Sequence, residues 1–366
     1  MIKKHTLKKV TFITGSLKMG GPQRVMVLLS EKFVRDGIDV KFITTVTNEV
    51  EYDLNPKIQH IKILKTSNFR ILKTLQKLIW FRQVLKKDDS DVIISFWYNV
   101  NMYLMVSSAF LNKRIILSER NDPRNEPKNA ILRKIRNFLY QFADLIVFQT
   151  NDAKAYYSKK IQAKSVIIPN PIKEDLPQRY TGIRRKEIVN FCRLSPQKNL
   201  FMLIDAFYLF HKEYDDYVLT IYGRGELKDK LIKYIDKLGL QNSVFIKDFD
   251  LDIHNKIKDC AMFVSSSDFE GISNSMLEAL AIGLPTICTD CPAGGAKMYI
   301  DSYKNGILVP VRDTNALYKA MKYIVENPEK ADNMSKNAVL IKEVLMPNKI
   351  YSRWLETIQS LIRQTL

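Results

Sequence analysis

Short runs of β-branched and aromatic residues alternate with stretches of helical periodicity along nearly the whole chain. Most of the short runs are continuously apolar, which is typical of strands that helices cover on both faces of a parallel sheet. Strand, helix and strand repeated in this order predict a doubly wound α/β fold. The expected strands are 9–14, 39–46, 58–64, 91–96, 114–118, 144–149 and 165–169, followed by 187–192, 217–223, 243–246, 261–265, 285–289 and 306–309.

The chain divides near Pro169-Asn-Pro171, where two prolines follow an expected strand and a polar stretch continues to about Arg185. Its 366 residues exceed the size at which one core keeps growing. We therefore predict two Rossmann-like domains, 1–170 and 171–345, with a cleft between them. Residues 346–366 are predicted to form a helix that crosses back to the first domain. Ligands of such sheets bind at the carboxyl ends of the strands.

The charge is unevenly distributed. Residues 1–170 carry 30 Lys and Arg against 14 Asp and Glu, whereas 171–366 carry 27 against 25, within a net charge of +18. A basic first half favours a polyanionic partner, namely anionic lipid, nucleic acid or a phosphorylated acceptor. The segments 69–87 and 128–142 mix basic and apolar residues at helical spacing. Each is either a helix that lies on an anionic bilayer or a sheet-covering helix with a basic solvent face.

No apolar run approaches the length of a membrane span and no secretory signal is visible, so we expect a cytoplasmic protein. The four cysteines are Cys192, Cys260, Cys288 and Cys291. The last two form a C-x-x-C, but the four scattered histidines add no zinc ligands at suitable spacing. We expect thiols, no metal and no cofactor.

The main motif of the second half is a pair of glutamates, Glu270 and Glu278. A buried run ends in Ser265-Ser-Ser, and Glu270-Gly271 and then a helix carrying Glu278 follow. We expect this helix to begin near 272–275, and if it begins early both carboxylates lie near one face. The free N–H groups of its first turn suit a diphosphate, and the carboxylates can accept hydrogen bonds from sugar hydroxyls.

Two cations follow the first strand of the second half. Arg193 and Lys198 stand five residues apart in Arg193-Leu-Ser-Pro-Gln-Lys198-Asn199. An arginine fork and a lysine point charge together can clamp a pyrophosphate.

Both motifs resemble the donor signature of the family 4 retaining glycosyltransferases, which have the two-domain GT-B fold. The resemblance implies that Glu270 contacts hydroxyls of the transferred sugar, that Glu278 binds the ribose hydroxyls, and that Arg193 and Lys198 stabilise the leaving diphosphate. It also implies that the backbone after Glu270 holds the distal phosphate and sugar. The residues concerned are Gly271, Ser273, Asn274 and Ser275.

Further segments fit the same resemblance. Gly20-Gly21 lie in a G-G-x-x-R loop like the one beside the donor phosphates, and Gly223 lies in a G-x-G turn like the one near the nucleotide. Asp248 belongs to the segment where the base usually stacks. We interpret Asp248-Phe-Asp250 as a solvated acidic loop, not as a metal-binding D-x-D.

The run Ser118-Glu119-Arg120-Asn121-Asp122-Pro123 resembles the branch that builds capsule, exopolysaccharide and lipid-linked oligosaccharides. Many relatives carry a histidine near this strand end, where Arg120 stands here. Glu119 and Arg120 are expected to position the acceptor or the sugar.

Together these features predict a retaining, metal-independent glycosyltransferase at the inner face of the cell membrane. It would move a hexose or N-acetylhexosamine from a nucleoside-diphosphate sugar, expected to be a UDP-sugar, to a glycan or polyprenyl-diphosphate-linked acceptor. The expected partners include an anionic membrane surface but no nucleic acid. The alternatives are a non-catalytic basic protein that binds nucleic acid or membrane, and a sugar-nucleotide epimerase or phosphorylase of the same architecture.

Overall fold

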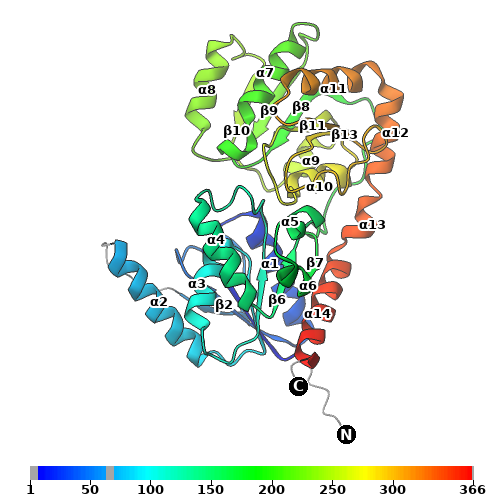
Figure 1. Cartoon of the computed structure of the whole chain (residues 1–366). Helices are drawn as coiled ribbons and strands as arrows, with labels where there is room; N and C mark the ends of the chain where they lie inside the picture. Colours follow the sequence, from blue (N-terminus) through cyan, green and yellow to red (C-terminus); the bar gives the residue numbers. More distant parts are fainter. Residues whose placement is uncertain (1–6, 63–69, 365–366) are drawn as a thin grey trace. The chain divides into compact units, whose positions relative to one another are not determined.

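The computed structural model describes residues 7–62 and 70–364, and its internal contacts divide the chain into two compact units (Figure 1). Unit 1 comprises Met1–Asn170 and Pro347–Leu366, and unit 2 comprises Pro171–Met346. The units meet in sequence at the proline pair where the sequence places the domain boundary. Each unit has a parallel sheet of its own, so the predicted fold class is confirmed.

Unit 1 is built on a seven-stranded parallel sheet in the order β3-β2-β1-β4-β5-β6-β7. Its strands are β1 (Lys9–Thr14), β2 (Asp39–Thr44), β3 (Gln59–Ile61), β4 (Val92–Ser95), β5 (Ile115–Ser118), β6 (Leu145–Phe148) and β7 (Ser165–Ile167). Its helices are α1 (Gly21–Arg35), α2 (Arg70–Lys87), α3 (Tyr98–Ser108), α4 (Ala130–Leu139), the short 3-10 turn η1 (Tyr140–Phe142), α5 (Asn151–Ala155), α6 (Lys159–Ala163) and α14 (Pro347–Gln364).

The continuous apolar runs become central strands for the expected reason. In the register of the sheet, Phe12 of β1 lies between Phe42 of β2 and Ile94 of β4, and all three are fully buried. The rings of Phe12 and Phe42 stack with their centroids 5.4 Å apart. The expected strand 58–64 is shorter in the structure, because β3 ends at Ile61, and residues 63 and 64 lie outside the described residues.

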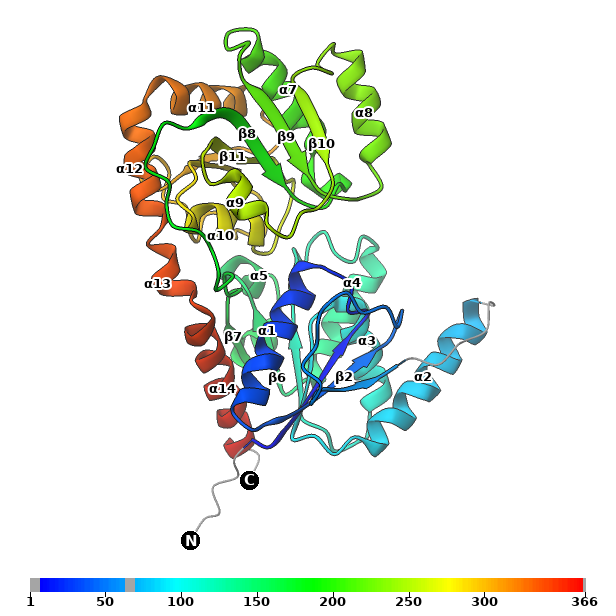
Figure 2. The ribbon, with the colours of Figure 1, turned by 180° about the vertical axis from the view of Figure 1, so that it is seen from behind.

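The C-terminal helix α14 packs on unit 1, where Figures 1 and 2 show it alongside β7. Trp354 is fully buried and stacks on Phe96, with ring centroids 5.4 Å apart. The Tyr351 hydroxyl donates to Asp36 at 2.6 Å, and the Arg353 guanidinium donates to the Ile167 carbonyl at the end of β7. The apolar positions at helical spacing in this segment are thus its inward face.

Unit 2 has a six-stranded parallel sheet in the order β10-β9-β8-β11-β12-β13. Its strands are β8 (Arg185–Phe191), β9 (Val218–Tyr222), β10 (Val244–Lys247), β11 (Cys260–Ser265), β12 (Thr286–Thr289) and β13 (Ile307–Val309). Its helices are the 3-10 turn η2 (Pro196–Lys198), α7 (Leu200–His211), α8 (Lys228–Lys237), α9 (Ile253–Ile257), α10 (Asn274–Ala281), α11 (Thr314–Glu326), α12 (Pro328–Ala338) and α13 (Ile341–Leu345). All strands run the same way, so their carboxyl ends form one side of the sheet, here called the carboxyl edge.

Within the described residues, no helix is both long enough and apolar enough to cross a bilayer.

Candidate active site

The centre of the carboxyl edge of unit 2 is an ion pair between Lys198 and Glu270. Lys198 ends the η2 turn after β8, Glu270 lies in the loop after β11, and the ammonium donates directly to Oε1 of the carboxylate. The Ser267 hydroxyl donates to the same oxygen at 2.9 Å. Both side chains of the ion pair are 14% exposed, so the pair is partly desolvated but open to a ligand.

Hydrogen bonds between the two loops hold this pair in place. The Gln197 side chain donates to the Phe269 carbonyl at 2.7 Å, and the Asn199 amide donates to Asp268 at 2.9 Å. The Ser266 hydroxyl donates to the Lys198 carbonyl at 2.9 Å. These hydrogen bonds fix the loops after β8 and β11 relative to each other, as a preorganised site for a charged ligand requires.

The electrostatics of Lys198 reflect two opposing causes. Burial acts to lower the pKa of the ammonium, but the neighbouring Glu270 carboxylate outweighs it, so the pKa is raised. Arg193, which is exposed, is close enough to lower the pKa of Lys198 to a small degree. Two positive charges therefore lie near each other at the edge of unit 2, as the sequence predicts for a diphosphate clamp.

Glycines let the backbone close around these loops. A Cβ on Gly295 would lie 1.9 Å from the Gly271 carbonyl oxygen, so only glycine fits where the loop after β12 meets the loop before α10. Gly223 has φ +155°, and a Cβ there would lie 1.8 Å from the Cys192 carbonyl oxygen. The predicted turn at Gly223 thus packs directly on the segment that leads to Arg193.

The residue at which α10 begins decides whether Glu270 and Glu278 can lie on one face of the same helix. α10 begins at Asn274 and is capped by Ser273, whose hydroxyl accepts from the Met276 N–H at 3.4 Å. Glu270 therefore lies in the loop before the helix, and the condition under which both carboxylates would share a helix face is not met. Ser275 lies in the first turn, with Asn274, as expected.

Glu278 lies in the second turn of α10 and is buried. Its Oε2 accepts a hydrogen bond from Nε2 of His254 on α9 at 2.8 Å. Sequence reasoning missed His254, because its partner is 24 residues away and nothing in the local pattern links the two. Only the approach of α9 to α10 shows the contact.

The acidic loop after β10 is solvated, in line with the interpretation of its sequence. Asp248 is exposed and its carboxylate pairs with Lys228 at 3.0 Å, while Asp250 pairs with Lys256. The hydrogen bond from Lys228 lowers the pKa of Asp248.

All four cysteines are free thiols. Burial raises the pKa of Cys192 and of Cys291 to about 12, so both remain protonated at neutral pH. Among the residues that the structure describes, no three His, Cys, Asp or Glu side chains cluster as metal ligands.

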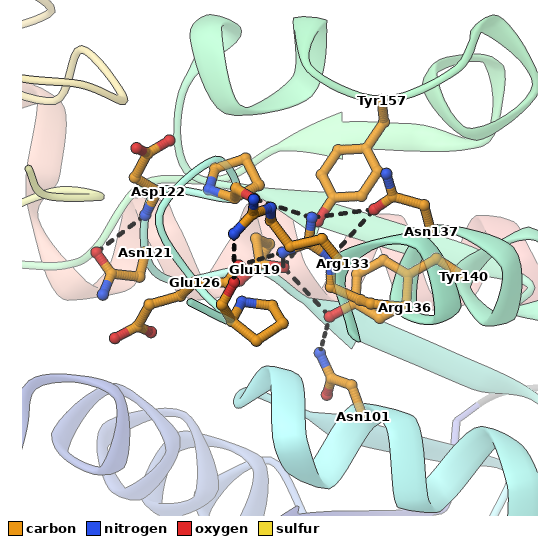
Figure 3. A network of polar contacts seen from close by, with 12 residues as sticks. Asn101, Glu119, Asn121, Asp122, Glu126, Arg133, Arg136, Asn137, Tyr140 and Tyr157 are labelled. Carbon is orange, nitrogen blue, oxygen red and sulfur yellow. Dashed lines mark hydrogen bonds and ion pairs between the residues drawn. The ribbon is translucent and has the colours of Figure 1, made fainter. Parts of the chain in front are cut away.

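The predicted site residues of unit 1 differ in burial, and Glu119 lies in the interior. Its carboxylate accepts from the Tyr157 hydroxyl at 2.9 Å and the Tyr140 hydroxyl at 3.2 Å, and lies 3.9 Å from the Arg136 guanidinium (Figure 3). Asn101 of α3 donates to Tyr140 at 2.8 Å. Burial raises the pKa of Glu119, against the opposing charge of Arg136. This enclosed network favours an indirect, positioning role for Glu119 over contact with a substrate.

Arg120, the next residue, is only partly buried and differs in its partners. Its guanidinium lies 4.0 Å above the ring of Phe96, and one terminal nitrogen donates to Asn170 at 2.8 Å. Its Nε and other terminal nitrogen have no hydrogen-bond partner, and it forms no ion pair within the described part of the chain. Burial lowers its pKa to about 9. A desolvated cation of this kind favours an anion.

Gly20 and Gly21 stand at the N-terminus of α1, with Gly20 as the N-cap and Pro22 in the first turn. The Tyr52 hydroxyl contacts both the N–H and the carbonyl of Gly20 at 3.1 Å. The backbone of Gly20 is extended, so its φ alone does not require glycine.

The chain matches two known domain families, which together span residues 19–340. Residues 19–176 match the family described as Glycosyltransferase Family 4, and residues 175–340 match the one described as Glycosyl transferases group 1. The chain belongs to the glycosyltransferases built from these two domains, which confirms the resemblance seen in the sequence.

Its similarity to individual proteins is moderate. An uncharacterised glycosyltransferase of Methanocaldococcus jannaschii is 32% identical over 67% of this chain, and the match spans 64% of that protein. The N-acetylgalactosamine-N,N'-diacetylbacillosaminyl-diphospho-undecaprenol 4-alpha-N-acetylgalactosaminyltransferase of Campylobacter jejuni is 27% identical over 88% of this chain and 91% of that enzyme. The crystal structure of Anabaena HepE in complex with UDP and glucose superposes with a TM-score of 0.84 at 18% identity, covering 97% of this chain and 100% of HepE. At that identity the superposition shows the shared fold.

Proposed function

We propose that this protein transfers a hexose or N-acetylhexosamine from a UDP-sugar to a glycan or polyprenyl-diphosphate-linked acceptor, with retention of configuration and without a metal. The observation that carries the proposal is the Lys198–Glu270 pair beside Arg193 at the carboxyl edge of unit 2. Cations and a carboxylate at one edge of a parallel sheet suit a ligand that carries both a diphosphate and sugar hydroxyls.

The residues of unit 2 have distinct roles in this reaction. Glu270 accepts hydrogen bonds from hydroxyls of the bound sugar, and the N–H groups of the first turn of α10 face the distal phosphate. The bond between the anomeric carbon and the phosphate oxygen breaks, and negative charge grows on the departing UDP. Lys198 and Arg193 stabilise that charge. The acceptor oxygen bonds to the anomeric carbon on the same face, and its proton passes to the departing diphosphate.

Several observations support the choice of substrates. HepE, which has the same fold, was crystallised with UDP and glucose, and the Campylobacter relative is named for a diphospho-undecaprenol acceptor. In unit 1, the guanidinium of Arg120 lacks an anionic partner within the described residues. We therefore expect Arg120 to contact a phosphate of the acceptor.

The proposed site of action is the inner face of the cell membrane, with α4 as the contact. Along α4 and the turn after it, Ile131, Leu132, Ile135, Phe138 and Phe142 are all exposed. The inward face of α4 instead carries the fully buried Arg136. Exposed Lys128 and Lys134 flank this apolar stripe, which gives it the charge that an anionic bilayer attracts.

A transfer assay tests the reaction. The protein is incubated with a panel of UDP-, GDP- and ADP-sugars and polyprenyl-diphosphate-linked glycans, with and without EDTA. We expect a product from a UDP-sugar in both conditions, with the anomeric configuration of the donor in its proton NMR spectrum. An inverted product, loss of activity in EDTA, or use of GDP-sugars alone would each contradict the corresponding part of the proposal.

Vesicle sedimentation tests the membrane contact. We expect the protein to bind vesicles with about a third anionic lipid, and Phe138→Ser to weaken the binding about tenfold, since a buried aromatic side chain contributes roughly 1.5–3 kcal/mol. Ile183→Ser, which changes an even more exposed apolar residue of unit 2, is the control. Equal binding of all three proteins would exclude α4 as the contact.

A further inference from the structure

His254 and Glu278 form a buried hydrogen bond that joins two helices of unit 2. The side chains are 7% and 4% exposed, and Nε2 of His254 lies 2.8 Å from Oε2 of Glu278. A carboxylate oxygen can only accept, so the Nε2–H of the imidazole is the donor. A buried carboxylate is costly without such a partner, which makes this contact more than a surface pair.

A second contact fixes the imidazole. The ring of Phe191, the last residue of β8, meets the His254 ring edge to face, with centroids 5.8 Å apart and an interplanar angle of 86°. His254 lies on α9, which follows β10, and Glu278 lies on α10, which follows β11. The histidine thus connects the end of β8 with the two helices that follow β10 and β11.

We propose that His254 is a positioning residue that orients the Glu278 carboxylate toward the ribose of the bound nucleotide, and thereby gives the protein its preference for ribonucleotides over 2′-deoxyribonucleotides. This inference rests on the proposed function and on the contact with the ribose hydroxyls that the family resemblance implies for Glu278.

The physical reason lies in the terminal torsion of glutamate. That torsion is broad, so an unrestrained carboxylate samples many orientations. The hydrogen bond from His254 to Oε2 selects one of them and fixes where the carboxylate accepts a further bond. A site built to accept from a hydroxyl discriminates strongly against a ligand that lacks it, because the buried acceptor then loses its partner.

Titration calorimetry with UDP and 2′-deoxy-UDP measures this preference without knowledge of the transferred sugar. For the unaltered protein, we expect UDP to bind at least about tenfold more tightly than 2′-deoxy-UDP, as for a hydrogen bond to a charged group. His254→Phe keeps the ring beside Phe191 but cannot donate, so the ratio should fall toward one. His254→Gln, whose amide can donate, should restore part of it.

A matched control separates positioning from general damage. His211 of α7 also makes one side-chain hydrogen bond, to Ser243 at 2.8 Å, and also contacts an aromatic ring, that of Phe207. His211→Phe should leave the UDP to 2′-deoxy-UDP ratio unchanged. Should His254→Phe fail to fold, His254→Asn replaces it, because its shorter amide does not reach Glu278.

The outcomes distinguish a failure of the role of His254 from a failure of the proposed function. If the unaltered protein prefers UDP and the His254 variant that folds keeps the full preference, the role of His254 is wrong while the proposed function stands. If the protein binds UDP without preferring it to 2′-deoxy-UDP, the ribose contact of Glu278 and the inference both fall. If it binds no UDP at all, the proposed donor itself is overturned.

Discussion

Each unit has a carboxylate in the loop after a strand of its parallel sheet, paired with a cation, but the two pairs differ in exposure. Arg136 and Glu119 of unit 1 are 0% and 2% exposed, 3.9 Å apart, and enclosed by Tyr140 and Tyr157. Lys198 and Glu270 of unit 2 are each 14% exposed and in direct contact.

The difference separates a structural pair from a ligand site. Arg136 also donates to the carbonyls of Pro123 and Glu126, so it holds the loop after β5 in place. The Lys198–Glu270 pair has an exposed arginine beside it and can exchange its partner for a ligand. Removal of a charge should therefore lower stability in unit 1 and lower activity in unit 2.

The largest expected effect follows from Arg136→Met. It leaves Glu119 buried without its cation, and such a change costs about 3–5 kcal/mol of unfolding free energy. Urea denaturation measures this loss. Arg124→Met, at an exposed arginine of the same loop, is the control and should change stability little. Equal stability of both variants would mean that the unit 1 pair is not structural.

The next effect is on turnover. Lys198→Met removes a charge from the site where the leaving diphosphate is stabilised, and we expect turnover to fall about 100- to 1000-fold. The melting temperature should change much less, since Glu270 keeps the Ser267 hydroxyl and partial contact with water. Lys230→Met, at an exposed lysine of α8, should behave as the unaltered protein. Full turnover in Lys198→Met would contradict the assignment of the site.

A smaller effect is expected on pH dependence. Burial raises the folded-state pKa of Glu119 above that of the unfolded chain, so the folded protein binds this proton more tightly. The contribution of Glu119 to unfolding free energy therefore falls as pH rises from the ordinary glutamate range, about 4.3, through the folded-state pKa. Denaturation curves at several pH values should show this decline in the unaltered protein and lose it in Glu119→Gln. The same slope in both would mean that Glu119 titrates normally.

The smallest effect concerns the exposed pair of Lys228 and Asp248. Exposed pairs contribute little, so Lys228→Ala should leave the unfolding transition where it is. A clear shift in that transition would show that exposure does not determine how much an ion pair contributes to the free energy of unfolding.

Much of the fold can be predicted from the sequence because parallel strands that are buried on both faces consist of continuous apolar runs. Lys9–Thr14 is β1 with the expected bounds, and most other expected strands differ by one or two residues at their ends. The start of α10 at Asn274 falls within the stretch that the sequence predicts. The close packing of Gly295 on Gly271 was not readable, because the two glycines lie in loops that follow different strands.

The site was predictable only where residues lie close in sequence or match a known motif. The proximity of Arg193 and Lys198 follows from a short loop after one strand. The burial of Glu119 and the contact between His254 and Glu278 depend on which side chains meet across the interior, and no spacing along the chain encodes that.

The most direct measurement is a crystal structure of the protein with UDP bound. The account predicts the diphosphate within hydrogen-bonding distance of the Arg193 and Lys198 side chains, and the ribose hydroxyls on Glu278. UDP bound elsewhere on the molecule, or with its diphosphate out of reach of both cations, would contradict it.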